Sequence, residues 1–505
     1  MMLRLSCRSS ALIALVCIVP LIKAQGIVIR QAQVIDGTGA PARRADVRVV
    51  ATRIVQIAPS ITASPNDTVI DAAGMVVAPG FIDLHNHSDR GLSDDPQAAS
   101  QVSQGITTAV VGVDGSSSWP IADWVAKRRA NPVAINLLTL VGHATVRSRA
   151  MAGGDYKRAA KPAEVDRMAS LVDQAMREGA IGLSSGLEYE VGSYSTTPEV
   201  IALAKAAAVR GGLYMSHIRD EADRTFEAIE EVITIAREAG VPAHISHLKL
   251  GTAGVWGKAP DAVSMLAKAR NSGLDITADC YPYDAWSSTI TVLVPNKQYE
   301  DPVSVAKALA DVGGPQNVLV TSCREHRDYE FQNLQQIAER KGKTAVDIFI
   351  EIVRSGGASV VGKAMQERDI RYFYAQPWIL IASDGGIGMR HPRATGSFPK
   401  VLGRYVREAH WLPLEEAIRK MTSAPAARLG LKDRGVVREG ALADLVIFDP
   451  KQVADQSTFA EPGKLSKGIQ LVLVNGTAVW RDGQTTTARP GLVITGDELL
   501  SGRRK

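Results

Sequence analysis

Cysteine is scarce in this chain, which has four in 505 residues. Cys7 and Cys17 lie within the first 24 residues, and no Cys-x-x-Cys pattern is present, so a cysteine-based metal or redox motif is not indicated. Cys280 and Cys323 remain. They could pair in an oxidising compartment, but the sequence alone does not decide this.

Long basic runs are also missing. Three cations before Gln25 contribute to the formal net charge of +5, which leaves +2 for the rest of the chain. Without a basic stripe, nucleic acid is not an expected partner. The sequence also has no internal repeat or low-complexity segment. The hydrophobic fraction of 45% and the charged fraction of 22% are typical of a soluble globular enzyme.

The N-terminus has the pattern of an export signal. Arg4 and Arg8 precede an apolar run over residues 11–22, and Ala24-Gln25 resembles a cleavage point. We therefore expect residues 1–24 to be a signal peptide and the protein to be periplasmic or extracellular, with no membrane span after signal removal. The alternative is a membrane anchor, for which the apolar run is short.

The segment 78–89 contains a short apolar run that ends in His85-Asn86-His87. Pro79-Gly80 precedes the run, as expected for the start of a buried strand. Residues i and i+2 of a strand point to the same face, so both imidazoles project together. Two imidazoles at a strand end suit a divalent transition metal, most often zinc. The alternative is a pair of hydrogen-bonded histidines at a strand edge.

Both ends of the mature chain are predicted to form short β-strands. Asp36-Gly37, Asn475-Gly476 and Asp482-Gly483 are turn signals between them. Each end alone has too few strands to bury a core. We therefore expect one small β-sandwich domain built from residues 25–76 and 420–505.

The middle of the chain, residues 77–419, alternates apolar strands with helix-like stretches, which predicts a parallel sheet. Eight such strands, buried on both faces, predict an α/β fold of the TIM-like (β/α)8 barrel type. An insertion at about 285–375 is too long for one crossover, so we expect a lid subdomain there. The expected strands are 81–87, 107–114, 134–143, 180–185, 213–217, 241–247, 274–281 and 378–384, and the clearest helices are 162–178, 199–210, 225–239 and 260–271.

Polar side chains follow these strands where active-site groups of such barrels lie. Packing alone does not account for so many ligand-type residues there. Asp384 ends the last strand and could bind a metal with one oxygen and reach a water with the other. Zinc lowers the pKa of a bound water from 15.7 to about 7, and a carboxylate can move its proton to a leaving amine. The strand-end residues are His85, His87, Asp114, His143, His217, His247 and Asp384.

Nearly the whole mature chain resembles the N-acyl-D-amino-acid deacylase (D-aminoacylase) family of the amidohydrolase superfamily. His-x-His alone is a weak signal, whereas the ordered series of motifs is specific. The motifs are Pro79–His87, Gly105–Thr108, Leu140–His143, Gly182–Tyr189, Ser216–Glu221, Ile245–Lys249, Tyr281–Tyr283, Ser383–Gly385, His391–Arg393, Gly396–Gly403 and Met421–Ala426.

The resemblance implies that His85, His87 and Asp384 hold one metal position, and that His217 and His247 hold the other. It implies that Asp384 is the general base and acid. It also implies that Lys249, Tyr283 and Arg393 bind the substrate carboxylate, a role that suits a bidentate arginine and a lysine charge.

One position departs from the family pattern. Asp114 stands where a cysteine usually ligates the tightly bound metal, and a carboxylate is a harder ligand than a thiolate. We therefore expect one or two Zn²⁺ ions, with Mn²⁺ or Co²⁺ as alternatives. Glu188 lies nearby and could be a metal ligand, but it is interpreted as a loop acid. The segment Arg219–Glu221 has two open interpretations, internal ion pairing or substrate contact.

The predicted function is a metal-dependent hydrolase that cleaves the non-peptide C–N bond of N-acyl-D-amino acids, with a small N-acyl amino acid or peptide-like substrate as its partner. Fold does not fix substrate, so a dipeptidase or cyclic-amide hydrolase of the same superfamily remains an alternative. A non-catalytic binding protein that lost a metal ligand at Asp114 is a third possibility. The oligomeric state is not determined by the sequence.

Overall fold

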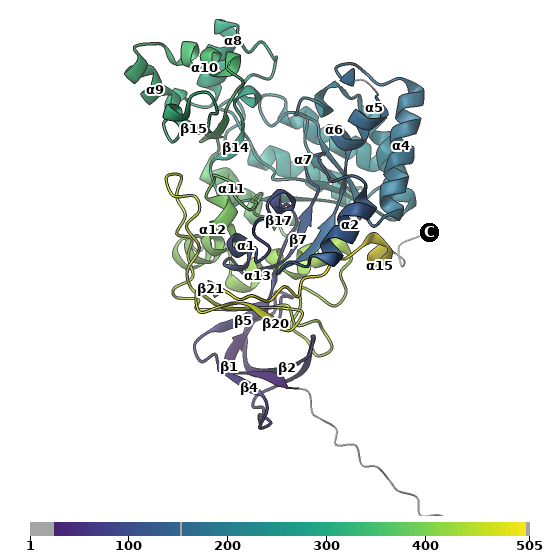
Figure 1. The fold of residues 1–505 in the computed structure, drawn as a ribbon, viewed down its shortest axis with the longest axis vertical. Helices are drawn as coiled ribbons and strands as arrows, with labels where there is room; N and C mark the ends of the chain where they lie inside the picture. Colours follow the sequence, from purple (N-terminus) through teal and green to yellow (C-terminus); the bar gives the residue numbers. More distant parts are fainter. Residues whose placement is uncertain (1–24, 152–153, 501–505) are drawn as a thin grey trace, which may run out of the picture.

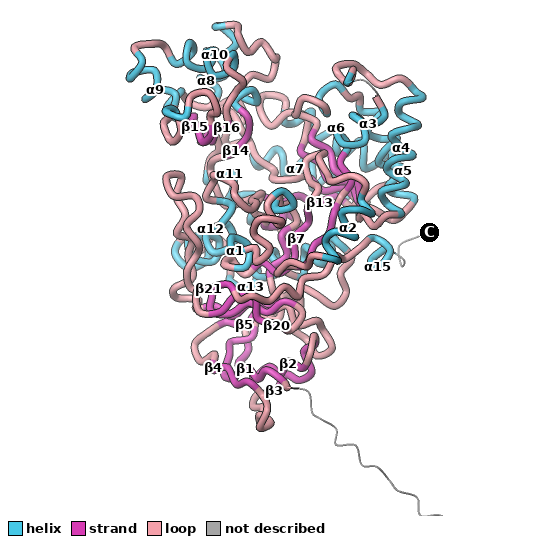
Figure 2. Tube along the Cα trace, viewed as in Figure 1, coloured by secondary structure: helices cyan, strands magenta, loops and turns pink. Residues whose placement is uncertain are grey.

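A computed structural model describes residues 25–151 and 154–500 (Figure 1). The expected signal peptide, residues 1–24, lies outside the described residues. Strands and helices alternate through the middle of the chain (Figure 2). The central strands are β6 (Phe81–Asp83), β7 (Ile106–Val111), β8 (Asn136–Thr139), β9 (Val141–Gly142), β10 (Gly182–Gly186), β11 (Leu213–His217), β12 (Ala243–Ile245), β13 (Ile276–Cys280) and β17 (Ile379–Ile381).

These strands form a closed parallel barrel. β6, β7 and β8 pair in that order, and β9 to β13 continue the series to β17. β8 and β9 act as one strand that is interrupted at Leu140. The ring closes between β6 and β17, where Asp384 N donates to His85 O at 3.0 Å and His87 N donates to Gly385 O at 2.7 Å. The predicted α/β barrel is therefore present.

Alternation along the strands explains why they are apolar on both faces. Ile82, Val110 and Leu138 belong to the cluster that fills the barrel. Their neighbours Phe81 and Leu137 instead pack in the larger outer core beneath the helices. A strand whose side chains are buried alternately inside and outside reads as a continuous hydrophobic run, as parallel barrel strands do.

Helices surround the barrel, and the four clearest predicted ones are confirmed within two residues at each end. These four are α4 (Pro162–Arg177), α5 (Thr197–Val209), α6 (Thr225–Ala239) and α7 (Ala259–Asn271). The other helical segments of this region are η1 (Ser88–Arg90), α1 (Ala99–Val102), α2 (Ile121–Ala130), α3 (His143–Ala150), η3 (Gly192–Tyr194), α11 (Glu367–Tyr374), α12 (Arg393–Lys400), the π-helix η7 (Val401–Glu408), α13 (Leu414–Met421) and α14 (Ser423–Leu429).

The strands at the two ends of the chain share one mixed sheet of nine strands, consistent with the expected β-sandwich domain. β5 pairs with β1 on one side and with β18 on the other, so it joins the N-terminal and C-terminal parts. Asn475-Gly476 and Asp482-Gly483 have left-handed backbones and connect hairpins, as predicted. The strands are β1 (Gly26–Val34), β2 (Arg43–Val50), β3 (Arg53–Ala58), β4 (Thr68–Asp71), β5 (Val76–Pro79), β18 (Leu445–Phe448), β19 (Ile469–Val474), β20 (Thr477–Arg481) and β21 (Gln484–Thr485).

The end of the chain returns to the barrel. Leu137 N donates to Leu492 O, and Ile494 N donates to Leu137 O. α15 (Gly496–Leu500) follows this contact. Within the range 420–505, α14 and residues 491–494 thus lie against the barrel rather than in the terminal sheet.

The insertion between β13 and β17 forms its own three-stranded antiparallel sheet, visible at the upper left of Figure 1. Phe349, Ile352 and Val360 are buried in it. α11 packs against α7 and β17, so residues 367–374 belong with the barrel. The elements are β14 (Trp286–Thr289), η4 (Ile290–Leu293), α8 (Pro302–Asp311), η5 (Pro315–Asn317), β15 (Val318–Ser322), η6 (Arg327–Tyr329), α9 (Leu334–Lys341), α10 (Ala345–Arg354) and β16 (Ser359–Gly362).

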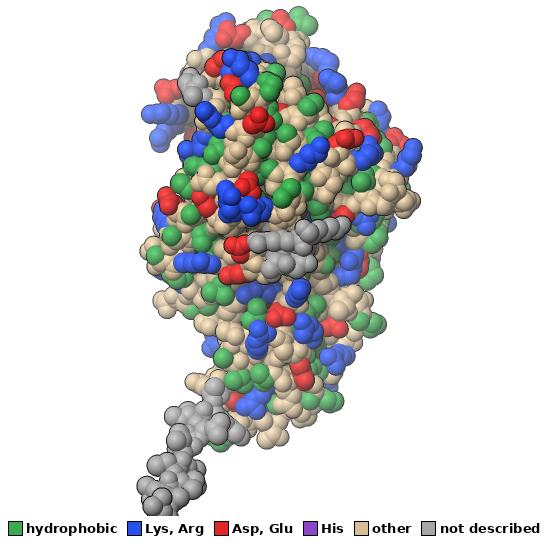
Figure 3. Space-filling view, turned by 90° about the vertical axis from the view of Figure 1, so that its right-hand side faces the viewer, with side chains coloured by type: hydrophobic (Ala, Val, Ile, Leu, Met, Phe, Trp, Pro, Cys, Tyr) green, Lys and Arg blue, Asp and Glu red, His purple; other side chains and the backbone are tan. Residues whose placement is uncertain are grey.

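Acidic and basic side chains are interspersed on the face shown in Figure 3, which is the right-hand side of Figure 1. None of the helices in the described part of the chain is both long and apolar enough to cross a membrane. Cys280 and Cys323 are buried and free, so they form no disulfide with each other.

Candidate metal centre

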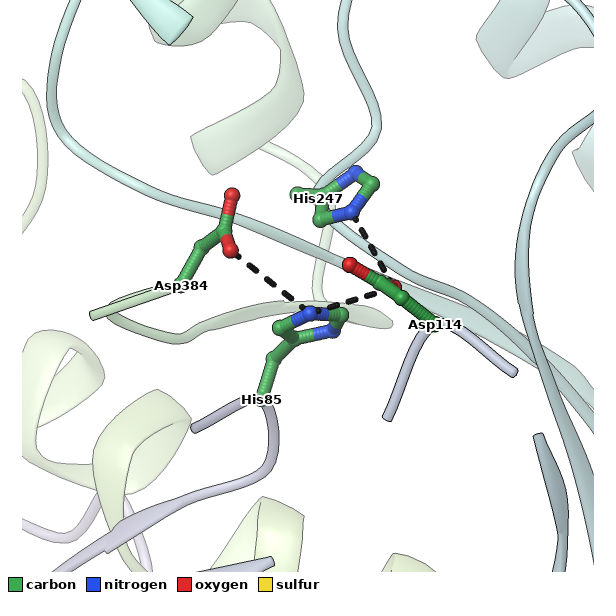
Figure 4. Close-up of side chains that lie close together, drawn as sticks. All are labelled: His85, Asp114, His247 and Asp384. Atoms are coloured by element: carbon green, nitrogen blue, oxygen red, sulfur yellow. Dashed lines mark ion pairs between the residues drawn. The ribbon is translucent and has the colours of Figure 1, made fainter. Parts of the chain in front are cut away.

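The barrel brings the predicted ligands together at the carboxyl ends of its strands. His85 and His87 follow β6, Asp114 follows β7, His247 follows β12, and Asp384 follows β17. Their side chains converge although the residues lie up to about 300 positions apart in sequence. Figure 4 shows four of them, His85, Asp114, His247 and Asp384. This convergence requires the barrel to close, because β6 and β17 are its first and last strands.

Four ligand atoms from His85, Asp114, His247 and Asp384 lie within 4.8 Å of one another. His85 Nε2 is 3.3 Å from Asp114 Oδ1 and 3.6 Å from Asp384 Oδ1. His247 Nε2 is 3.5 Å from Asp114 Oδ1 (Figure 4). His87 Nε2 adds a fifth donor, 3.2 Å from Asp384 Oδ1. Nitrogen and carboxylate oxygen donors around one point are a set that suits zinc.

Unpaired polar atoms in the centre support the fit to a cation. Both ring nitrogens of His85 and Oδ1 of Asp114 are buried and have no hydrogen-bond partner within the described part of the protein. A buried polar atom without a partner costs about 1–3 kcal/mol. A cation bound between these atoms would satisfy Asp114 and one His85 nitrogen.

The electrostatics of the centre also favour a cation. Burial and the neighbouring Lys249 lower the pKa of His247, but the carboxylates of Asp384, Glu221 and Asp114 outweigh them and raise it to about 10. Without a metal, a proton on His247 therefore compensates the clustered negative charge. Metal binding would displace that proton, since only neutral imidazole is a ligand.

Three residues of the centre have left-handed backbones. The φ angles are +54° at Asp114, +36° at His247 and +49° at Asp384. Such conformations are uncommon outside glycine and cluster at functional sites, where surrounding structure holds them. Asp279 contributes here, because its Oδ1 accepts a hydrogen bond from His247 N at 2.8 Å. Asp83 acts similarly before Asp384, accepting from Ser383 N at 2.9 Å.

His217 belongs to a second, adjoining group with Glu221 and His247. Its Nδ1 lies 3.1 Å from His247 Nε2, and its Nε2 lies 2.8 Å from Glu188 Oε2. Glu188 is therefore part of the site and not a loop acid. Glu221 Oε1 lies 3.1 Å from His247 Nδ1 and 2.5 Å from Lys249 Nζ, as the ion-pairing interpretation expects. The sequence offered one signal for each of these acids. Glu221 follows His217 by four residues, and Glu188 lies near the end of a predicted strand.

The two predicted carboxylate-binding cations flank the metal centre. Arg393 Nη1 is 2.8 Å from Asp384 Oδ2. Lys249 Nζ is 2.5 Å from Glu221 Oε1 and 2.7 Å from His247 Nδ1. Both cations also lie over the ring of Tyr281, at 4.9 Å for Arg393 and 5.8 Å for Lys249. Both positive charges thus lie beside the metal centre and over the same tyrosine ring.

Tyr283 is placed differently from the sequence prediction. Its hydroxyl donates toward Pro392 O and Asp455 Oδ2, each at 3.3 Å. It does not line the cavity at the centre, so the structure does not bring it together with Lys249 and Arg393. Tyr281, which sequence reasoning left without a role, is the tyrosine beside both cations. β13 ends at Cys280, so strand alternation no longer controls the direction of either tyrosine.

His143 is a strand-end histidine that lies outside the centre. Its Nε2 is 2.9 Å from Glu199 Oε1, and Arg147 pairs with the same carboxylate. Arg147 also donates to the carbonyl oxygen of Tyr156 at 3.2 Å. This buried network fixes the segment after α3 and has no contact with the predicted ligands.

A cavity of about 1550 Å³ opens onto the centre. His87, Asp114, His217, His247 and Asp384 form part of its wall. Residues of the insertion, among them Trp286 and Tyr299, also line this cavity. Cys323 and Tyr329 are instead buried within the insertion, and His326 stacks on Tyr329.

The barrel, the terminal sheet and the candidate His/Asp metal site fit a hydrolase of the amidohydrolase class, and the family model described as "Amidohydrolase family" matches residues 68–484. The chain belongs to the amidohydrolase family. It is 36% identical over 500 residues to N-acyl-D-glutamate deacylase of Alcaligenes xylosoxydans xylosoxydans, covering 94% of this chain and 98% of that protein. Within the family, this chain is a hydrolase of the N-acyl-D-amino-acid deacylase type, acting on carbon–nitrogen bonds other than peptide bonds.

Two solved structures of proteins with bound metal are similar to this chain. N-acyl-D-glutamate deacylase of Bordetella bronchiseptica, complexed with zinc and a phosphonate mimic of the tetrahedral intermediate, matches with a TM-score of 0.85 and 35% identity. The match covers 94% of this chain and 100% of the Bordetella bronchiseptica chain. A D-aminoacylase with a binuclear metal centre matches with a TM-score of 0.83 and 34% identity, covering 93% and 99%.

Proposed function

We propose that this protein hydrolyses N-acyl-D-amino acids to a carboxylate and a free D-amino acid. The observation that carries the proposal is the position of Asp384. One of its oxygens faces His85 and His87, and the other lies 2.8 Å from Arg393. A metal-facing carboxylate is thus combined with a cation that can bind a substrate carboxylate.

The ligand set that we propose comprises the predicted residues. His85, His87 and Asp384 would hold one Zn²⁺, and His217 and His247 would hold a second, with Asp114 able to reach both positions. Mn²⁺ or Co²⁺ could replace zinc because Asp114 is a hard ligand. Zinc, when bound, polarises a carbonyl and lowers the pKa of water from 15.7 to about 7.

Asp384 is the proposed general base and acid. Burial alone would raise the pKa of its carboxyl, but the neighbouring charge of Arg393 lowers it below the ordinary value. Asp384 is therefore ionised and able to accept a proton from the attacking water. It then returns this proton to the leaving amine, so that a neutral amino group departs.

Arg393 and Lys249 are the proposed anchors for the substrate carboxylate. In the described structure each is paired with a carboxylate of the site, Asp384 and Glu221 respectively. A substrate carboxylate would share these cations. When the substrate carboxylate also pairs with Arg393, the arginine charge lowers the pKa of Asp384 less. Asp384 is then a stronger base when substrate is present.

Two further features belong to the proposal. The unit formed by residues 286–362 acts as a lid, since Trp286 and Thr291 line the cavity that opens onto the metal centre. The protein is exported to the periplasm or extracellular space, as the pattern of residues 1–24 indicates. The mass of the secreted protein tests the second point, because cleavage after Ala24 leaves Gln25 as the first residue.

The test of the activity is a release assay. Purified protein, loaded with Zn²⁺, Mn²⁺ or Co²⁺ in turn, is given paired N-acetyl-D- and N-acetyl-L-amino acids, and free amine is measured. We expect turnover of the D series, with kcat/KM reduced at least 100-fold by Asp384→Ala. Turnover of dipeptides or cyclic amides alone would overturn the proposal, as would an Asp384→Ala variant that retains activity.

A further inference from the structure

The inside of the barrel is apolar along most of its strands. Ile82, Val110 and Leu138 face it from β6, β7 and β8, and Met215 and Leu380 join the same cluster from β11 and β17. A polar side chain that enters this space loses its water and must find partners among the side chains around it. Any polar group inside the barrel therefore needs an explanation.

β12 and β13 place two polar side chains in this interior. On β12, Ala243 and Ile245 belong to the outer core, so His244 between them faces inward. On β13, Ala278 and Cys280 belong to the outer core, so Asp279 also faces inward. Both polar residues are fully buried. The barrel thus encloses a histidine and a carboxylate below the strand ends that carry the metal centre.

The two side chains form a pair. His244 Nε2 lies 2.8 Å from Asp279 Oδ2, and His244 Nδ1 lies 2.7 Å from Thr277 Oγ1. Both ring nitrogens of His244 are thereby occupied, and neither His244 nor Asp279 belongs to the candidate metal groups of the described residues. Replacing a buried ion pair by apolar residues is often neutral or stabilising, so stability alone does not account for this pair.

The second oxygen of the Asp279 carboxylate reaches the metal centre. Asp279 Oδ1 accepts a hydrogen bond from His247 N at 2.8 Å. The backbone oxygen of Asp279 accepts a second one, from Leu248 N at 2.7 Å. β13 therefore holds two consecutive amides of the segment after β12. The first of them belongs to a residue with a φ of +36°, a conformation that surrounding structure must maintain.

The direction of His247 matters for the whole centre. Its Nε2 lies 3.5 Å from Asp114 Oδ1 and 3.1 Å from His217 Nδ1. His247 is also the residue that the two candidate metal groups have in common. A backbone that relaxed at this position would move the imidazole away from both groups at once.

We infer that His244 and Asp279 are positioning residues of the metal centre. His244 orients the Asp279 carboxylate, and this carboxylate holds the backbone of His247 so that its imidazole reaches both metal positions. The inference rests on the proposed function for the identity of the metal ligands, and it does not depend on the substrate. Loss of a group that orients a metal ligand typically weakens metal binding about 10–100-fold.

The test compares substitutions of similar size at position 279. Asp279→Leu suits the apolar interior but leaves His247 N without its acceptor, so we expect zinc to bind at least tenfold more weakly. Asp279→Asn keeps an oxygen for His247 N and should stay within about threefold of the parent. The measurement is the zinc dissociation constant, from competition with a chromophoric chelator. Parental zinc affinity in Asp279→Leu would overturn the inference.

The histidine is tested in the same way. His244→Leu leaves the Asp279 carboxylate without its partner, and we expect zinc affinity to fall at least threefold. His244→Gln can still donate a hydrogen bond to Asp279 and should restore most of the affinity. The visible absorption of bound Co²⁺ should change in His244→Leu and be parental in His244→Gln. Parental affinity and absorption in His244→Leu would limit the positioning role to Asp279 and overturn the part assigned to His244.

His143→Ala is the matched control. It breaks another buried histidine–carboxylate pair, in which His143 Nε2 is 2.9 Å from Glu199 Oε1, and this pair has no contact with the predicted ligands. Its zinc affinity should stay within about twofold of the parent, although its free energy of unfolding falls. Zinc binding weakened as much as in His244→Leu would show a general loss of stability and overturn the inference.

Metal binding is measured without substrate, so this inference and the proposed function can fail separately. A parent protein that binds zinc but releases no amine from any N-acyl-D-amino acid contradicts the proposed function alone. The inference is then still decided by the zinc affinities of the variants at positions 244 and 279.

Discussion

Asp114 is the residue that most distinguishes this metal centre. It stands where the related deacylases are expected to have a cysteine, and its two oxygens lie 3.3 Å from His85 and 3.5 Å from His87. Its left-handed backbone suits aspartate better than most residues. A carboxylate at this position keeps the donor count but makes the site harder.

Asp114→Cys should therefore raise the affinity for Zn²⁺ at least tenfold relative to Mn²⁺, because a thiolate is a softer ligand. The measurement is the dissociation constant of each ion, from competition with a chromophoric chelator. Asp114→Ala is the control, since it shares the backbone strain but supplies no donor, and it should bind both ions at least tenfold more weakly. Unchanged zinc affinity in Asp114→Ala would exclude Asp114 as a ligand.

At the scale of elements, the start of α12 depends on a loop from the C-terminal part of the chain. Pro392 O accepts hydrogen bonds from Tyr283 at 3.3 Å and from Ser457 at 3.0 Å. Asp455 accepts from the same tyrosine hydroxyl. These contacts fix the backbone next to Arg393, so the residues around position 455 support a cation of the active site that they do not touch.

Asp455→Ala and Tyr283→Phe should each raise KM for an N-acyl-D-amino acid about fivefold, with less than a twofold change in kcat and an unchanged metal content. The reason is that both release Arg393 from its position, which weakens substrate binding. The measurement is steady-state kinetics, with metal analysis of the same samples. Tyr372→Phe, on the exposed face of α11, is a control that should behave as the parent.

The double variant distinguishes positioning from direct substrate contact. If both residues act through Pro392, the effects on KM should not add. A normal KM in Asp455→Ala, with a raised KM in Tyr283→Phe, would contradict this account. It would instead return Tyr283 to the substrate-binding role that the family resemblance implied.

At the scale of the whole molecule, a buried lysine affects the stability of the barrel. Lys420 of α13 is 1% exposed and donates to Ile379 O at 2.7 Å and to Gln376 O. It therefore joins a helix to the start of β17. Burial lowers the pKa of Lys420 from 10.5 to about 8, although Glu416 opposes the shift.

Stability should consequently rise with pH between 8 and 10.5, because in this range the unfolded chain binds a proton at Lys420 that the folded protein has released. The gain is roughly 3 kcal/mol at 1.36 kcal/mol per pKa unit. The measurement is the free energy of unfolding of the protein and of Lys420→Met by denaturant titration across this range. All other titrating groups are common to both, so parallel pH profiles would contradict the prediction.

The sequence alone determined the features that depend on local pattern. Apolar runs of strand length, helix-period stretches between them and the Asn-Gly and Asp-Gly turns were enough to predict the barrel and the terminal strands. The histidines and aspartates just after those runs predicted the metal centre, since the carboxyl ends of parallel strands meet at one mouth. These inferences hold because strand direction and side-chain alternation are properties of consecutive residues.

Only the tertiary structure decided which side chains face one another. Tyr281 rather than Tyr283 lies beside Arg393, because the chain has left β13 before either residue and packing sets their directions. Glu188 contacts His217 from the neighbouring strand. His143 also follows a strand, as His217 does, but it pairs with Glu199 instead. Such pairings join residues tens of positions apart. They depend on three-dimensional packing and competition for partners, which no local pattern encodes.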